Sequence, residues 1–123
     1  MPRILVVDDD ADIRDMLQFK LAKAGYEVHT EEDGETGLAA ARELGPDLIL
    51  LDWMMPRLTG PEVCRELRAD EATLRVPVIL LTAKAQEADV QRGFATGADD
   101  YIPKPFSPRE LMSRVQALLA RAA

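Results

Sequence analysis

The chain has 123 residues, 47% hydrophobic and 30% charged, which is typical of one folded domain rather than a disordered chain. Its net charge of −7 repels nucleic-acid phosphates, and its single cysteine excludes an internal disulfide or a multi-cysteine zinc site. No apolar run is long enough to cross a bilayer, so we expect a single acidic domain in the reducing cytoplasm.

Five short apolar runs recur along the chain, and they predict five β-strands. The first, third and fourth runs are apolar throughout, which is typical of strands buried on both faces of a parallel sheet. The expected strands cover residues 4–7, 26–30, 48–51, 78–81 and 101–102.

Stretches with apolar residues at steps of three or four lie between these runs and predict helices. Gly25 and Gly45 supply stops after the first two, and Pro61 opens the third. Residues 107–110 form a capping box with proline at the first helical position of the fifth. The apolar positions lie within 13–24, 38–44, 63–67, 87–95 and 111–119. The alternation predicts one (βα)₅ domain of the α/β class over residues 1–123, with helices on both faces of an open parallel sheet.

Polar residues cluster where the apolar runs end. Asp8 and Asp9 follow the first run, Asp52 the third, Thr82 the fourth, and Lys104 the fifth. Ligands of open α/β sheets bind beyond the carboxyl ends of the strands, at the topological switch point. The doubly wound, flavodoxin-like order 2-1-3-4-5 brings these residues to one edge, whereas the order 3-2-1-4-5 separates Asp52 from Asp8. We therefore expect the order 2-1-3-4-5, with the second strand at an edge.

The chemistry of this cluster points to phosphoryl transfer. The carboxylates of Asp8, Asp9 and Asp52 repel one another unless a cation is bound, and oxygen ligands favour Mg²⁺. A carboxylate beside Mg²⁺ can attack a phosphoryl group and form an acyl phosphate. The Lys104 ammonium and the Thr82 hydroxyl would then contact the phosphoryl oxygens.

The segments that carry these residues resemble the receiver domain of two-component response regulators, which has a CheY-like fold. The resemblance extends over essentially the whole chain and rests on residues 6–9, 51–56, 81–83 and 104–106. It implies that Asp52 is phosphorylated by a partner sensor histidine kinase. It also implies that Asp9, Asp52 and the backbone carbonyl of Met54 bind Mg²⁺ directly, with Asp8 acting mainly through water.

The resemblance further implies a conformational switch. Thr82 and Lys104 would both bind the phosphoryl group. Thr82 would move toward this group, and the Tyr101 ring would then turn inward. The face formed by the fourth helix, the fifth strand and the fifth helix would then change shape. The peptide bond between Lys104 and Pro105 would be cis, a form that belongs largely to proline.

Residues 97–111 are most similar to the OmpR/PhoB-type subfamily, whose members carry a C-terminal winged helix. This similarity implies a homodimer through the same face, held by charge pairs between subunits. Asp100 and Arg114 match one pair. Glu110 matches the acidic half of another pair, but valine stands at position 90, where the subfamily has the basic partner. The implied output is transcription through a DNA-binding domain outside this chain, and the alternative is a stand-alone receiver that acts by protein–protein interaction.

Three other functions fit parts of the pattern. A haloacid-dehalogenase-type phosphatase needs a second acid two residues after its nucleophile, where this chain has Met54. A flavin or nucleotide binder needs a phosphate-cradling loop after the first strand, and the acidic residues 8–10 would repel a phosphate. A pseudo-receiver would bind partners without being phosphorylated, and the intact Asp, Thr and Lys set argues against it. We predict a signalling receiver that modifies itself but converts no external metabolite, and therefore not an enzyme.

Individual residues have further expected roles. Asp10 fits either a turn or the N-cap of the first helix. Cys64 has the helical spacing of a packed thiol. His29, the only histidine, is expected at the surface or half-buried in the second strand, so the phosphoryl donor must be another molecule. Met54 and Lys84 are expected to set the lifetime of the acyl phosphate, because an apolar Met54 cannot orient an attacking water.

Overall fold

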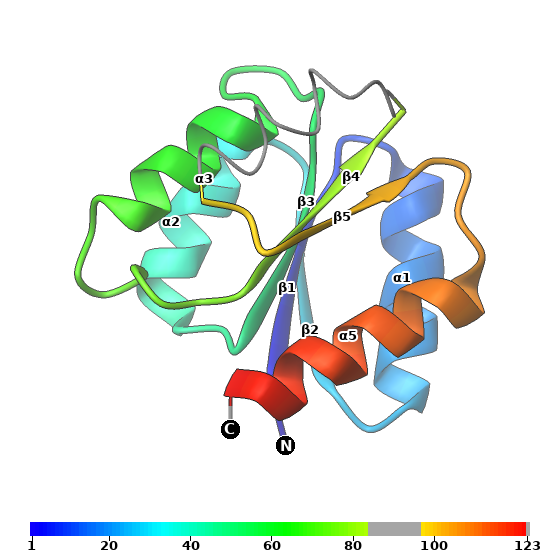
Figure 1. Ribbon diagram of the computed structural model, residues 1–123. Helices are drawn as coiled ribbons and strands as arrows, with labels where there is room; N and C mark the ends of the chain where they lie inside the picture. The colour runs from blue at the N-terminus through cyan, green and yellow to red at the C-terminus, as the bar shows by residue number, and fades with distance from the viewer. Residues whose placement is uncertain (84–96, 123) are drawn as a thin grey trace.

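The computed structural model describes residues 1–83 and 97–122 of the chain (Figure 1). The helix expected near residues 87–95, and with it Val90, lies outside the described residues, as does Lys84.

Five parallel strands form a single sheet in the order β2-β1-β3-β4-β5, which confirms the predicted topology. The strands are β1 (Arg3–Val7), β2 (Glu27–Glu31), β3 (Leu48–Asp52), β4 (Val78–Thr82) and β5 (Asp100–Pro103). Their bounds differ by a residue or two from the apolar runs, because a strand is defined by backbone pairing and not by hydrophobic side chains. Asp52 pairs with Leu81, and Thr82 pairs with Pro103, so two of the predicted site residues are the last residues of strands.

The helices cover both faces of the sheet, as the alternation of elements predicted. They are α1 (Ala11–Lys23), α2 (Gly34–Leu44), α3 (Gly60–Arg68) and α5 (Pro108–Ala122). Figure 1 shows α2 and α3 on one face and α1 and α5 on the other. Among the described residues, no helix combines the length and hydropathy needed to cross a membrane.

Side-chain caps fix where the helices begin. Asp10 is the N-cap of α1, since its Oδ1 accepts from the backbone N–H groups of Asp12 at 2.9 Å and Ile13 at 3.3 Å. Thr59 and Glu62 form a complete capping box at the start of α3, which the sequence analysis did not single out. At α5, the Ser107 hydroxyl accepts from the N–H of Glu110 at 3.4 Å.

Alternate strand residues supply two separate hydrophobic layers. In β1, Leu5 and Val7 join the layer under α2 and α3, whereas Ile4 and Val6 join the layer under α1 and α5. Every residue of β3 and β4 is buried, as the continuous apolar runs predicted. Cys64 is fully buried in the first layer, as expected. The central strands are therefore held rigidly from both sides, and their carboxyl ends form a fixed edge.

Candidate functional site

The carboxyl edge of the sheet brings the predicted residues together. Oxygen atoms of Asp8, Asp9 and Asp52 all lie within 4.8 Å of one another. The Lys104 Nζ lies 2.9 Å from Asp8 Oδ2 and 3.1 Å from Asp52 Oδ1. Asp8 directly follows β1, and Asp52 ends β3, which pairs with β1. The predicted strand order is therefore what joins these groups.

The site has a buried floor and an exposed rim. Asp8 is 0% exposed, Asp52 is 6% exposed and Thr82 is 1% exposed. Asp9 is exposed at the surface, and Lys104 is half-buried. A ligand therefore has access to the cluster from the side of Asp9.

Burial and mutual repulsion perturb the titration of this cluster. Burial and the neighbouring Asp8 carboxylate raise the pKa of Asp52 to about 7, although Lys104 acts in the opposite direction. Burial alone lowers the pKa of Lys104. Its hydrogen bond to Asp8 and the charges of Asp52 and Asp8 more than offset burial, so that pKa is raised overall. One ammonium does not neutralise three carboxylates, and these oxygen ligands fit Mg²⁺.

A link between backbone atoms joins the ends of β4 and β5 at the site. The backbone N–H of Lys104 donates to the carbonyl of Thr82 at 2.7 Å. The peptide bond between Lys104 and Pro105 is cis, as the resemblance implies. Thr82 and Lys104, which are 22 positions apart, are thereby held next to one another.

The loop after β3 lies close against the phosphoacceptor candidate. The N–H of Gly60 donates to the Trp53 carbonyl at 2.9 Å. A Cβ at Gly60 would lie 2.5 Å from the carbonyl oxygen of Asp52, so only glycine allows this approach. Met54 is 57% exposed and Trp53 is 6% exposed, although the two are adjacent.

Arg14 belongs to this region, and sequence reasoning missed it. Its Nη1 donates to the backbone carbonyl of Asp8 at 2.7 Å. A basic residue so near the N-terminus of a helix is disfavoured by the helix dipole unless it has a partner. That unfavourable position was the available signal.

The sequence matches the family described as "Response regulator receiver domain" over residues 4–116. The chain belongs to this family. Receiver domains are signalling components of two-component systems, and phosphorylation of an aspartate with Mg²⁺ is typical of them. The predicted family and fold class are thus confirmed.

Relatives of known role are of the OmpR/PhoB type, as the sequence analysis expected. The receiver is 50% identical over 121 residues to the "DNA-binding dual master transcriptional regulator RpaA" of Synechocystis sp., which is 98% of this chain and 50% of RpaA. It is also 50% identical over 118 residues to the "Phosphate regulon transcriptional regulatory protein PhoB" of Pseudomonas aeruginosa, which is 96% of this chain and 52% of PhoB. The receiver spans about half the length of the curated relatives it matches.

Solved structures agree with the fold. The receiver domain of the Francisella response regulator 1452 is 35% identical, with a TM-score of 0.93 and coverage of 100% of both chains. The receiver domain of the sensor histidine kinase PA1611 from Pseudomonas aeruginosa is 34% identical, with a TM-score of 0.89 and coverage of 97% of this chain and 98% of that one. The PA1611 structure has a magnesium ion coordinated in its active-site cleft.

The remaining predicted residues of the receiver lie on β5 and α5. Tyr101 is half-buried and packs against the layer under α2 and α3. Arg114 Nη1 lies 2.7 Å from Asp100 Oδ1, and Arg114 Nη2 lies 3.3 Å from Glu110 Oε1. The two residues expected to pair across a dimer are therefore paired within one chain.

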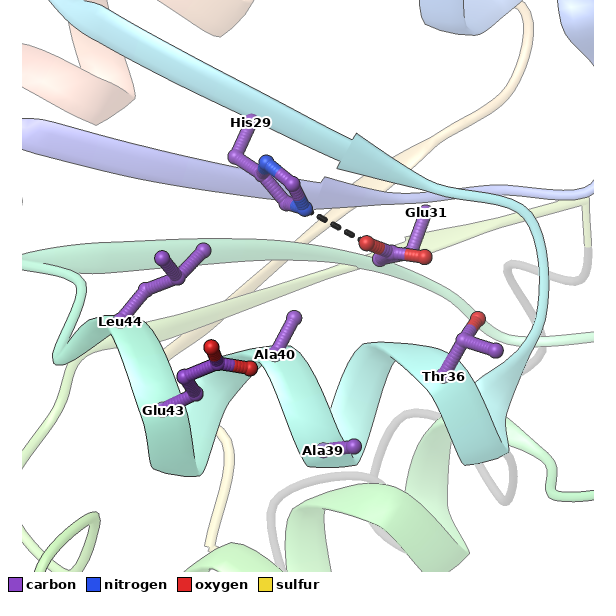
Figure 2. A pocket seen from close by; sticks show the side chains of 7 residues that line it. All are labelled: His29, Glu31, Thr36, Ala39, Ala40, Glu43 and Leu44. Atoms are coloured by element: carbon purple, nitrogen blue, oxygen red, sulfur yellow. Dashed lines mark hydrogen bonds and ion pairs between the residues drawn. The ribbon is translucent and has the colours of Figure 1, made fainter.

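A groove of about 310 Å³ lies at the opposite edge of the receiver, between β2 and α2 (Figure 2). His29 and Glu31 lie on the same face of β2, and His29 Nε2 is 2.5 Å from Glu31 Oε2, as the dashed line in Figure 2 shows. The other lining residues are Thr36, Ala39, Ala40, Glu43 and Leu44. His29 is exposed on the edge strand and lines this groove, as the sequence analysis expected of a surface residue.

Proposed function

We propose that this receiver accepts a phosphoryl group on Asp52 from a sensor histidine kinase, in a reaction that uses Mg²⁺. The observation that carries the proposal is the convergence of Asp52 with Asp8, Asp9 and Lys104 at one edge of the sheet. The Mg²⁺ ion would be held by Asp9, Asp52 and the Met54 carbonyl, with Asp8 acting through water. When bound, it would neutralise charge on the carboxylates and on the incoming phosphoryl oxygens.

The chain's own groups perform the rest of the reaction. An Asp52 carboxylate oxygen attacks phosphorus and forms the new P–O bond. The P–N bond to the donor imidazole breaks, and its electron pair stays on the imidazole nitrogen. The Lys104 ammonium, already 3.1 Å from Asp52, attracts the phosphoryl oxygens as a point charge, and the Thr82 hydroxyl donates a hydrogen bond to them once the group is bound.

An apolar groove beside the site supports the approach of a partner protein. It has a volume of about 430 Å³ and opens between the first helix and the loop after β5. Its lining is almost entirely apolar; the residues are Ile13, Met16, Ala83, Lys104, Pro105 and Phe106. Because the site reacts with a group carried by another molecule, an apolar surface at its rim favours a protein donor.

The output is regulated transcription through a DNA-binding domain outside this chain, with residues 1–123 as the receiver domain. The names of RpaA and PhoB, both transcriptional regulators of about twice this length, support this output. The receiver acts in the cytoplasm and is not an enzyme, because it modifies itself and turns over no external metabolite.

The signal passes from the site to the face that contains β5 and α5. Thr82 and Tyr101 act as the switch pair, and the altered face forms a homodimer in which Asp100, Glu110 and Arg114 contribute charge pairs. The hydrogen bond from the backbone N–H of Lys104 to the carbonyl of Thr82 supports this route, since it joins the end of β5 to the end of β4.

Fluorescence of Trp53 tests the proposal directly. Trp53 is the only tryptophan, it is buried, and it adjoins Asp52. Mg²⁺ should give a saturable change, and beryllofluoride, a phosphoryl mimic, should give a further one that is lost in Asp52→Asn. If neither fluorescence nor calorimetry detects Mg²⁺ or beryllofluoride in the wild type, the chain is a pseudo-receiver and the proposal fails.

A further inference from the structure

Arg14 connects the first turns of α1 to the backbone of the acidic turn after β1. Its guanidinium donates to the Asp8 carbonyl at 2.7 Å, a length typical of a charge-assisted hydrogen bond, and the bond is partly buried. This carbonyl belongs to the peptide unit that joins Asp8 to Asp9. Because peptide units are planar, holding the carbonyl also fixes the direction of the N–Cα bond of Asp9.

The other polar groups of Asp8 are held by different parts of the fold. Its N–H donates to the Glu31 carbonyl at 3.1 Å, and its Oδ1 accepts from the N–H of Asp10 at 2.9 Å. Its Oδ2 accepts from Lys104 Nζ at 2.9 Å. Asp8 is therefore anchored through every polar group, and Arg14 is the anchor nearest to the peptide of Asp9.

Asp9 has the most exposed carboxylate of the cluster, yet one of its oxygens lies within 4.8 Å of oxygens of both Asp8 and Asp52. Unlike Asp8, it is not enclosed by the core, so its position depends more on the backbone of the turn. We propose that Arg14 is a positioning residue, which holds the Asp8 carbonyl so that the Asp9 carboxylate stays within the cluster and binds Mg²⁺ more tightly. This inference rests on the proposed function, in which Asp9 is a ligand of Mg²⁺.

Charge alone predicts the opposite effect. A guanidinium near the site repels a divalent cation, so its removal would tighten Mg²⁺ binding if Arg14 acted only through its field. Loss of positioning weakens Mg²⁺ binding instead. The sign of the change therefore separates the two roles.

The experiment titrates Mg²⁺ into wild type, Arg14→Gln and Arg14→Lys while following Trp53 fluorescence. Arg42→Gln is the matched control, because Arg42 lies on α2 in an ion pair with Asp70 at 3.1 Å and outside the site. For Arg14→Gln we expect the Mg²⁺ dissociation constant to rise about ten- to thirty-fold, near the lower end of the loss typical of one charge-assisted hydrogen bond. The dissociation constant of Arg42→Gln should stay within about twofold of the wild-type value, because exposed charges far from the site are screened.

A second readout separates positioning from chemistry. The Mg²⁺ concentration that gives half-maximal phosphorylation of Arg14→Gln should rise by the same factor as the dissociation constant. Its maximal rate at saturating Mg²⁺ should stay within about twofold of wild type, because Arg14 does not touch the reacting atoms. Arg14→Lys keeps the charge but not the planar guanidinium, so its Mg²⁺ dissociation constant should lie between those of wild type and Arg14→Gln.

Each remaining outcome overturns one idea. If Arg14→Gln binds Mg²⁺ as tightly as wild type or more tightly, the positioning role is wrong. If Arg14→Gln weakens Mg²⁺ binding but Arg14→Lys matches wild type fully, the planar guanidinium is not what holds the turn, and the inference also fails. If Arg14→Gln does not fold by circular dichroism, the Arg14→Lys titration decides, with a rise of at least about threefold required. A wild type that binds no Mg²⁺ defeats the proposed function instead.

Discussion

Asp52→Asn should stabilise the metal-free receiver, and the gain should grow between about pH 4 and about pH 7. Burial raises the pKa of the Asp52 carboxyl from 3.8 to about 7. Between these values the unfolded chain has lost the proton while the folded chain keeps it, so wild-type stability falls as the pH rises. Below both values the carboxyl is neutral in either state, and asparagine, with a similar shape, should change little.

The magnitude follows from the same shift. A rise from 3.8 to about 7 corresponds to roughly 4 kcal/mol if each unit is worth about 1.36 kcal/mol. Water at the exposed rim near Asp9 screens part of this electrostatic energy. Replacing Asp52 by asparagine also weakens the contact with Lys104, which reduces the gain further. We therefore expect a net gain of about 1–2 kcal/mol above neutral pH, or a rise in Tm of roughly 4–8 °C for a chain of this size.

Thermal unfolding followed by circular dichroism measures this gain. Wild type and Asp52→Asn are compared in a chelator at about pH 3 and about pH 7.5, below and above both pKa values. Asp15→Asn removes the same charge from the exposed part of α1 and serves as the control. Millimolar Mg²⁺ at the higher pH should raise the wild-type Tm more than that of Asp52→Asn, because it binds the ionised site. An equal Tm difference at both pH values, or a less stable Asp52→Asn at the higher pH, would refute the reasoning.

Three further substitutions test other parts of the site. Met54→Asn should shorten the lifetime of the phosphorylated receiver about tenfold, because an amide at this exposed position can orient water; an unchanged rate of dephosphorylation on phosphate-affinity gels contradicts it. Gly60→Ala should lower the free energy of unfolding in urea by about 2 kcal/mol or more, since its Cβ meets the Asp52 carbonyl at 2.5 Å, and wild-type stability would disprove the clash. Arg114→Ala should abolish beryllofluoride-induced dimerisation in size-exclusion chromatography while leaving beryllofluoride binding intact. Persistent dimers would show that the pair with Asp100 serves only the monomer.

Much of the sheet could be predicted because a strand that is buried on both faces needs apolar residues at every position. The runs at 48–51 and 78–81 are apolar at every position, and both strands are buried throughout. The order of the strands followed from chemistry rather than from hydropathy. Of the two strand orders compared, 2-1-3-4-5 alone makes β1 and β3 neighbours, so that Asp8 and Asp52 can share Lys104 as a partner.

What the sequence did not predict depends on backbone atoms or on local geometry. Arg14 binds a carbonyl group, which every residue possesses, so no residue type marks its partner. Arg57 adopts a φ of 75° although it is not glycine; Pro56 before it favours a turn, but arginine at this position does not indicate a positive φ. The contact between Asp100 and Arg114 within one chain was not predicted either, because the resemblance implied only their pairing between subunits, which stays a prediction.

Lys104 is the residue through which charge in the site can affect the shape of β5. Its ammonium bridges Asp8 and Asp52, and its backbone N–H donates to the carbonyl of Thr82 at 2.7 Å. A change of charge on Asp52 alters the force on the side chain of Lys104, while a displacement of Thr82 acts on its backbone. Tyr101 lies in the short strand that ends one residue before Lys104. The switch that we propose therefore needs no long chain of contacts, because the group that senses the phosphoryl charge and the strand that carries the aromatic ring meet at one residue.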